Sequence, residues 1–225
     1  MDLLNLEVAR EFARPLLQGL AVTVMLTLVV ITLSLILAIP VALMRLSSRR
    51  LVRVLVGIYV EVIRGTPLLL QLVYIYYVLP SIGLNLDPFV AAIFGLTLNY
   101  TAYMSEVYRG GIIAVPKSQW EAAATLGMTQ ARAFWRIILP QALRIVTPTL
   151  GNYFISLFKD TALASVVTVQ ELTFTGQIIS ARSYQYFTIY TLTGILYLSV
   201  GYPAALLVCA LEKHSRGGYR RIKRS

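Results

Sequence analysis

Long runs without a charged residue are the feature that most limits how this chain of 225 residues can fold. The runs that lack Asp, Glu, Lys and Arg are 15–44, 65–86, 88–105, 145–158 and 183–211. A helix needs about 20 apolar residues to cross a bilayer, so three runs are long enough, one is slightly short and one is clearly short. With 57% hydrophobic and 13% charged residues, the chain cannot keep so much apolar surface in water. We therefore predict an all-α integral membrane protein with about five transmembrane helices.

The positive residues between these runs predict an orientation. Lys and Arg are dense in residues 45–53, 109–136 and 212–225 and sparse in 80–88 and 159–186. Because Lys and Arg collect in cytoplasmic loops, we expect the N-terminus outside and the C-terminus inside. Membrane orientation thus explains the net charge of +10 better than nucleic-acid binding does.

The chain is expected to divide into three stretches. Residues 1–16 mix apolar and charged positions and predict a short interfacial segment. Residues 17–212 would form the transmembrane domain, and residues 213–225 a basic tail near cytoplasmic headgroups. One Cys and one His, Cys209 and His214, are too few for a disulfide framework or a metal cluster, so no metal site is expected.

Residues 121–140 carry the most specific pattern in the sequence. They read Glu-Ala-Ala, three residues, Gly127, nine residues and then Ile-Ile-Leu-Pro. Ser118 and Glu121 predict a capping box at the start of a short helix, and Gly127 can take the left-handed conformation that ends one. An ordinary cytoplasmic hairpin is the alternative, because capping boxes are common in loops.

One side of that short helix is predicted to be a docking surface. Trp120, Ala123, Ala124 and Gly127 fall at helical spacing and combine small side chains with a single aromatic ring. Another protein can pack closely against such a surface.

The whole pattern resembles the EAA loop of ABC-importer membrane subunits, the permeases of binding-protein-dependent transport. Residues 61–68, 99–112 and 159–163 are similar to segments of the polar amino acid branch of that family. They read Glu-Val-Ile-Arg-Gly-Thr-Pro-Leu, Asn-Tyr-Thr-Ala-Tyr-Met-Ser-Glu-Val-Tyr-Arg-Gly-Gly-Ile and Lys-Asp-Thr-Ala-Leu. The resemblance extends over residues 18–212.

The resemblance implies a cytoplasmic coupling helix at residues 117–128, within a coupling loop at 114–136. The residues that it would bring to an ATP-binding subunit are Trp120, Glu121, Ala122, Ala123 and Gly127. It further implies a multi-pass subunit of the bacterial cytoplasmic (inner) membrane, paired with an identical or similar permease chain. Two ATP-binding subunits, with ATP and Mg²⁺, would lie beneath, and a substrate-binding protein outside.

The chain itself is not expected to be an enzyme or to hold a cofactor. It has no Gly-x-x-x-x-Gly-Lys-Ser/Thr loop, which is the usual cradle for ATP phosphates. An intramembrane enzyme that uses Glu106 and Asp160 as acid–base groups is an alternative, but neither His-Glu-x-x-His nor Gly-x-Ser-x-Gly occurs. A permease for another small solute and a membrane scaffold are further alternatives.

Two spans are predicted to be broken. Residues 64–67, Arg-Gly-Thr-Pro, interrupt the second, and Pro140 with Pro148 divide the fourth into short pieces. Interrupted membrane helices frequently hold a transporter's substrate, because unwound backbone is tolerated only where it lines protein or water. A proline kink in a packed bundle is the alternative.

A substrate site centred on Glu106 is expected on the third span. Asn99, Tyr103 and Glu106 are spaced four and three residues apart and therefore share one helix face. An amide, a phenol and a carboxylate suit a polar cavity better than lipid. Arg109 lies three residues after Glu106, so a structural ion pair is the alternative.

The rest of the expected site comes from the two broken spans. Asp160 would be a second carboxylate, and Arg64, Thr66 and Leu68 lie at the break that would hold the substrate's carboxylate. Two acids in one cavity would favour a basic amino acid. We therefore expect an importer subunit for a polar, possibly basic, amino acid.

Overall fold

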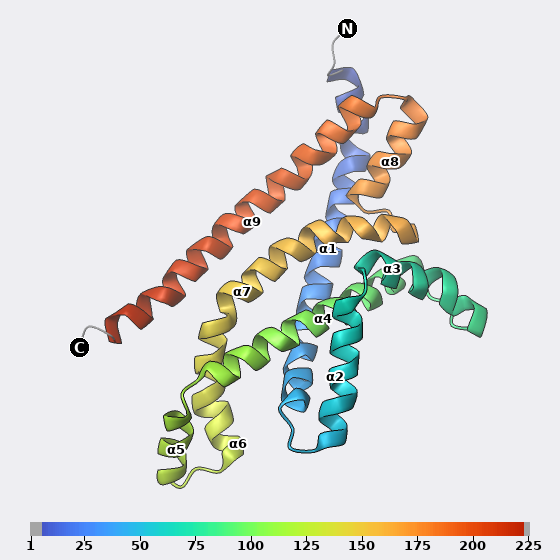
Figure 1. Ribbon diagram of the computed structural model, residues 1–225. Coiled ribbons are helices and arrows are strands. Elements are labelled where there is room, and N and C mark those ends of the chain that lie inside the picture. The colour runs from blue at the N-terminus through green and yellow to red at the C-terminus, as the bar shows by residue number, and fades with distance from the viewer. Residues whose placement is uncertain (1–5, 223–225) are drawn as a thin grey trace.

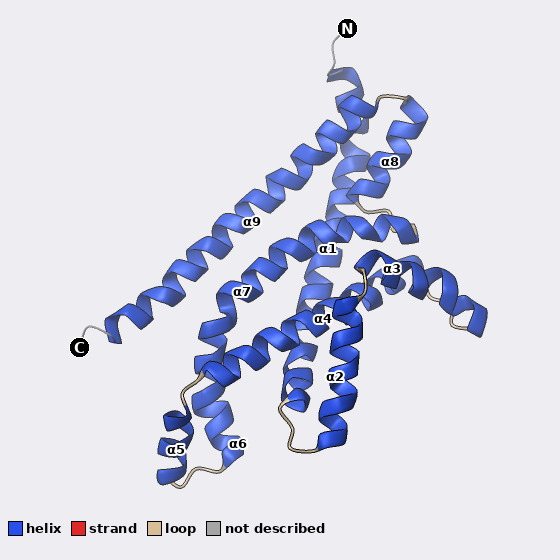
Figure 2. Ribbon diagram, in the orientation of Figure 1, coloured by secondary structure: helices blue, strands red, loops and turns tan. Residues whose placement is uncertain are grey.

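The computed structural model describes residues 6–222, and this part of the chain is helical and contains no strand (Figure 1, Figure 2). The long helices are α1 (Leu6–Arg45), α2 (Arg50–Gly65), α4 (Pro88–Ala114), α7 (Leu139–Asp160) and α9 (Tyr186–Ile222). The shorter helices are α3 (Leu68–Val73), α5 (Lys117–Thr125), α6 (Gln130–Ala133) and α8 (Leu172–Ser183). Tyr74–Val78 and Phe134–Ile138 are π-helical, and Leu79–Ile82 and Thr161–Val167 are 3₁₀-helical.

Two described helices are long and apolar enough to cross a membrane alone, Arg10–Arg45 and Tyr186–Ala210, and two bent pairs bring the number to as many as four. The pairs are Arg50–Gly65 with Leu68–Ile82, bent by 107°, and Gln130–Val167 with Leu172–Ser183, bent by 51°. The third predicted span is α4, whose 27 residues reach about 40 Å. It lies in the middle of the bundle, packed against α1 and α7 (Figure 1).

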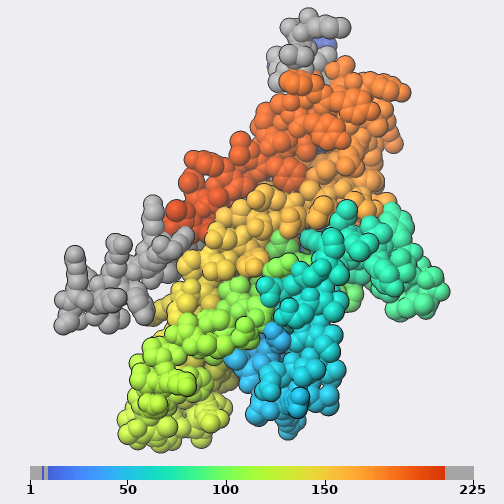
Figure 3. Space-filling model, in the orientation of Figure 1, coloured from blue at the N-terminus to red at the C-terminus, as the bar shows by residue number. Residues whose placement is uncertain are grey.

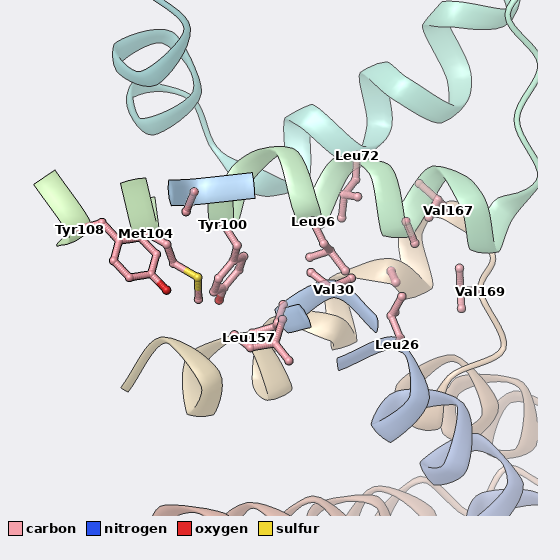
Figure 4. Packing of buried hydrophobic residues seen from close by; sticks show 14 of the residues in the cluster. Leu26, Val30, Leu72, Leu96, Tyr100, Met104, Tyr108, Leu157, Val167 and Val169 are labelled. Carbon is pink, nitrogen blue, oxygen red and sulfur yellow. The ribbon is translucent and has the colours of Figure 1, made fainter. Parts of the chain in front are cut away.

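The main hydrophobic core forms where α1, α4 and α7 meet (Figure 4). Leu26 and Val30 of α1, Leu96 and Met104 of α4 and Leu157 of α7 are fully buried there. Small residues let the helices approach closely. This matters in a membrane, because lipid gives helices no hydrophobic reason to associate and close packing must hold them together. A Cβ atom at Gly111 of α4, for example, would overlap Val146 of α7.

The two arginine-rich loops lie at one end of the molecule. The loop between α1 and α2 and the hairpin of α5 and α6 are at the lower end of Figure 1 and Figure 3, while the N-terminal part of α1, α8 and the start of α9 are at the upper end of Figure 1. This arrangement agrees with loops that share one side of a membrane.

The predicted break in the second span is confirmed. Helix α2 ends at Gly65, and Thr66 and Pro67 are extended before α3 departs at 107°. The ring of Pro67 disfavours a helical conformation at Thr66, so the helix must end there. The helix also begins earlier than the charge-free run suggested, at Arg50.

The predicted break in the fourth span is wrong, because α7 is continuous and contains Pro148. Pro140 directly follows a π-helical turn in which the Leu139 N–H reaches back five residues to the Phe134 carbonyl. The N–H that Pro140 lacks would lie where the helix changes from π-type to α-type hydrogen bonds. Its absence therefore disrupts the helix less than it would in a regular α-helix. Near Pro148, the Thr147 hydroxyl donates to the Leu143 carbonyl at 2.7 Å. The chain bends only after Val167.

The two predicted terminal segments are not separate elements where the structure describes them. Residues 6–16 are the first turns of α1, which continues without interruption, and α9 continues through Ile222. Residues 1–5 and 223–225 of these segments lie outside the described part of the chain.

A buried carboxylate joins α1, α8 and α9 at the upper end of the molecule. Glu171 is fully buried, and its oxygens accept the backbone N–H groups of Thr173 at 2.9 Å and Phe174 at 2.7 Å. The Tyr197 hydroxyl of α9 donates to it at 2.8 Å, and Thr23 of α1 accepts the neighbouring Leu172 N–H at 3.1 Å. Glu171 thus caps α8 and fixes it between two long helices.

Replacing this carboxylate is expected to destabilise the protein. Glu171→Ala leaves two partly buried N–H groups and the Tyr197 hydroxyl without this acceptor, at a cost of about 3 kcal/mol. Glu171→Gln keeps the shape and one acceptor oxygen, so its effect is expected to be smaller. Thermal unfolding in detergent, followed by size-exclusion chromatography, measures both. Equal stability of Glu171→Ala and wild type would contradict the capping role.

Candidate functional site

A pocket of about 520 Å³ lies where the break between α2 and α3 meets α4 and α7. Its volume is in the range of pockets that hold small molecules. The lining residues are Arg64, Gly65, Thr66, Pro67, Leu68, Asn99, Tyr100, Tyr103, Tyr153, Ser156 and Asp160. The pocket is therefore formed by a helix break and by one face of each of two long helices.

Helical spacing explains the contribution of α7. Tyr153, Ser156 and Asp160 are three and four residues apart, so the uninterrupted helix carries them on one face. Tyr153 packs against the α4 side of the pocket, with its ring 6.2 Å from the ring of Tyr100 and 6.0 Å from that of Tyr103.

One negative and one positive side chain line this pocket. The Tyr100 hydroxyl donates to Asp160 Oδ2 at 2.7 Å, and Tyr100 is only 3% exposed, so the carboxylate is held in place. The Arg64 guanidinium lies 5.2 Å from the centre of the Tyr103 ring. Among the residues whose side chains the structure describes, neither Arg64 nor Asp160 forms an ion pair. Both charges are therefore available to a ligand.

Most of the substrate residues expected from the sequence come together in this pocket. Those that line it are Arg64, Thr66, Leu68, Asn99, Tyr103 and Asp160. Gly65 and Pro67, which belong to the predicted break, line it as well, and the lining residues that sequence reasoning missed are Tyr100, Tyr153 and Ser156. The spacing of Tyr153 and Ser156 before Asp160 could have revealed them, but the fourth span was interpreted as broken, which concealed the helix face.

Glu106 does not line the pocket and lies in an ion cluster instead. Arg45 Nε donates to Glu106 Oε1 at 3.0 Å, and Arg109 Nη2 donates to Oε2 at 2.7 Å. The Glu106 side chain is 14% exposed. Arg45 also reaches Glu61, at 3.4 Å. The ion pair with Arg109 is the alternative that the spacing had left open, whereas Arg45 lies 61 residues away and no spacing pointed to it.

Gly127 forms the turn that ends the short helix α5, as predicted. Gly127 has φ +70°, its N–H donates to the Ala124 carbonyl at 2.9 Å, and the Met128 N–H donates to the Ala123 carbonyl at 3.1 Å. These two bonds form a Schellman motif, which satisfies carbonyls at a helix end. The predicted capping box is wrong, because α5 begins at Lys117 after Pro116 and has no side-chain cap. Ser118 therefore lies inside the first turn.

The residues of the predicted docking side of α5 do not all face outward in the structure. Ala123 is 1% exposed, and Trp120 packs against a small core that includes Val115 and Ile138. These two residues hold α5 against its own chain. The outward side presents other residues: Glu121, Ala122, Ala124, Thr125, Leu126 and Gly127 are exposed, and Leu126 is 77% exposed.

Comparisons with known proteins find relatives of this chain. Residues 31–217 match the family described as the binding-protein-dependent transport system inner membrane component. The chain is 43% identical over 196 residues to the L-cystine transport system permease protein TcyB of Bacillus subtilis (strain 168), which covers 87% of this chain and 84% of that protein. It is 36% identical over 219 residues to the nopaline transport system permease protein NocM of Agrobacterium fabrum (strain C58 / ATCC 33970), over 93% and 91% of the two chains. The crystal structure of an amino acid ABC transporter with histidines matches with a TM-score of 0.87 and 36% identity, over 94% of this chain and 99% of that chain.

Proposed function

Because the chain belongs to the family of inner membrane components of binding-protein-dependent transport systems, we propose that it is the transmembrane subunit of an ATP-driven importer for a polar amino acid. The observation that carries this proposal is the pocket with unpaired Arg64 and Asp160. A zwitterionic amino acid has a carboxylate that can pair with Arg64 and an ammonium group that can pair with Asp160. Charged groups inside a membrane are costly unless they are paired or hydrated, so a pocket that keeps both is suited to such a ligand.

In this proposal the ammonium group of the substrate would face Asp160 and its carboxylate would face Arg64. Tyr103 and Tyr153 would cover the nonpolar part of the substrate. Since Glu106 lies outside the lining, the pocket offers one carboxylate rather than two. The geometry therefore favours a zwitterion but does not select a basic side chain.

Transport is tested directly in proteoliposomes that contain the chain, its ATP-binding subunits and its binding protein. We expect ATP-dependent uptake of radiolabelled amino acids that unlabelled amino acids compete away. Competition by sugars alone would overturn the substrate class. Turnover of a substrate without any ATP-binding subunit would overturn transport in favour of an intramembrane enzyme.

The expected partners follow from the same membership. Two ATP-binding subunits, which carry ATP and Mg²⁺, would dock at the end where α5 lies, and a second permease chain would complete the pathway. The binding protein would meet the opposite end. This assembly requires α5 in the cytoplasm, the N-terminus outside and the C-terminus inside the bacterial cytoplasmic (inner) membrane.

Reporter fusions are expected to give this orientation. A fusion after Ser225 should be active only with a cytoplasmic reporter, and an insertion at Gly83 only with a periplasmic one. Gly83 suits an insertion because it lies in a loop with open space around it. A periplasmic signal after Ser225 would contradict the orientation and the coupling role of α5.

Gly127→Leu is expected to uncouple ATP hydrolysis from uptake. A leucine strains the left-handed backbone at φ +70° by about 1–2 kcal/mol and so disturbs the end of α5. Gly127→Asn should have a weaker effect, because asparagine tolerates this conformation. Gly110→Ala is the matched control, since Gly110 is helical and has open space beside it. Uptake and ATPase rates are compared in proteoliposomes, and wild-type coupling in Gly127→Leu would refute the role.

A further inference from the structure

Gln71 is a buried polar residue on α3 that lies beside the pocket but does not line it. It is 8% exposed. Its Nε2 donates to the Ile63 carbonyl at 2.8 Å and to the Thr66 carbonyl at 3.1 Å, and it approaches Thr66 Oγ1 at 2.8 Å. Its Oε1 accepts from Asn99 Nδ2 of α4 at 3.1 Å. Both ends of the amide group are therefore engaged.

The first group of contacts closes the break between α2 and α3. The last carbonyls of a helix have no partner inside the helix. Because Thr66 and Pro67 are extended, the chain cannot satisfy the carbonyls of Ile63 and Thr66 by continuing the helix. Unpaired backbone groups inside a membrane are expensive, and the Gln71 amide supplies the donors from the following helix. The Gln71 side chain thereby helps to fix the angle between α2 and α3.

The contact with Asn99 connects the break to α4. Thr66 and Asn99 both line the pocket, from the break and from α4 respectively. Gln71 binds both, and its bond to Asn99 joins residues 28 positions apart. The side chain of Gln71 therefore sets the separation of these two pocket walls and the orientation of the Asn99 amide.

We propose that Gln71 is a positioning residue of the substrate pocket, which controls affinity and preference among amino acids without touching the substrate. This inference rests on the proposed function of the pocket. Substitution would let the α2–α3 break and α4 move relative to each other, which would change the width of the pocket. Amino acids of different size would then be affected to different degrees.

The proposal is tested by measuring binding to the complex of this chain and its ATP-binding subunits. The binding protein is omitted, because it would dominate the apparent KM of uptake. The probes are radiolabelled L-glutamine, L-arginine and L-cystine. For Gln71→Leu we expect the Kd of the best probe to rise about tenfold, the equivalent of about 1.4 kcal/mol, through the loss of buried hydrogen bonds. The ratio of Kd values between small and large probes should change as well.

Gln71→Glu provides a second variant if the leucine variant does not assemble. It keeps the length of the side chain and an acceptor for Asn99, but it loses the amide donors. Because its second oxygen then faces the carbonyls of Ile63 and Thr66, which repel it, we expect a rise in Kd at least as large and the same direction of change in preference. Unchanged affinity and unchanged preference in Gln71→Glu would overturn the proposal.

Gln141→Leu is the matched control. Gln141 is a half-buried glutamine whose Nε2 donates to the Ile137 carbonyl at 3.0 Å and to Gln119 Oε1 at 3.2 Å, and it does not line the pocket. Its substitution removes the same kinds of bond as Gln71→Leu. Because these bonds lie outside the pocket, Kd should not change. Asp160→Asn, measured in parallel, reports on the pocket itself.

The two substitutions separate the two hypotheses. If Asp160→Asn raises Kd but Gln71→Leu changes only the yield of assembled complex, Gln71 is structural and the positioning role is wrong, while the pocket stands. If neither substitution changes Kd, the pocket assignment fails and the positioning role fails with it. A rise in Kd and a changed preference in Gln71→Leu, without either effect in Gln141→Leu, would support the proposal.

Discussion

Asp160→Asn is expected to reduce amino acid uptake to about 1% of the wild-type rate or less. The substitution keeps an acceptor for the Tyr100 hydroxyl, which is 2.7 Å from Asp160 Oδ2, so the pocket should keep its shape. It removes the only carboxylate among the described lining residues. Asp160 is half-buried, so leaving the substrate ammonium unpaired beside it costs about 3 kcal/mol, the upper value for a hydrogen bond to a charged group and the equivalent of about 100-fold in affinity.

Uptake in proteoliposomes and equilibrium binding to the complex measure this effect together. Asp87→Asn is the matched control, because Asp87 caps α4 through the Phe89 N–H at 2.9 Å and lies outside the pocket. Asparagine is an equally good cap, so this variant should transport normally. Normal uptake in Asp160→Asn would refute the substrate pose and with it the main argument for the pocket.

Glu106→Ala is expected to destabilise the protein strongly rather than to change its substrate. The substitution leaves Arg45 and Arg109, whose side chains are 20% and 34% exposed, without their shared carboxylate. Removing one partner of a largely buried ion pair costs about 3–5 kcal/mol, because the remaining charge is uncompensated. Glu106→Gln should be less damaging, since it keeps one acceptor for a guanidinium group.

The same cluster contains a matched control. Glu61 lies 3.4 Å from Arg45, but its side chain is 68% exposed. Ion pairs exposed to this degree contribute about 1 kcal/mol at most, so Glu61→Ala should be nearly as stable as wild type. Expression level and thermal unfolding in detergent measure the three variants. If Glu106→Ala assembles normally and loses only substrate binding, the site that the sequence predicted around Glu106 is restored.

Features that depend on neighbouring residues could be predicted from the sequence. Charge-free runs identify the apolar helices, because the thickness of a bilayer fixes the length they need. Pro67 ends α2 and Gly127 ends α5, because the conformations that these residues permit are local properties. The pattern around Glu121 resembles the loop of the family, and that resemblance depends on no tertiary contact.

Local rules also produced errors where tertiary packing competes with them. Pro140 and Pro148 predict breaks in isolation, yet a π-turn and a continuous bundle helix accommodate both. Trp120 and Ala123 share a helix face, but spacing does not say whether that face meets a partner or its own chain. The structure packs Trp120 against Val115 and Ile138.

The tertiary structure alone decided which polar groups meet. Asn99, Tyr103 and Glu106 share a face of α4. Asn99 and Tyr103 line the pocket, whereas Glu106 belongs to the ion cluster, where Arg45 of α1 donates to it. The sequence does not indicate a role for Gln71, because a single glutamine in an apolar run forms no pattern. Helical periodicity gives the face of each helix, whereas the rotation and crossing of the helices, which follow from packing over the whole core, select the partner of each face.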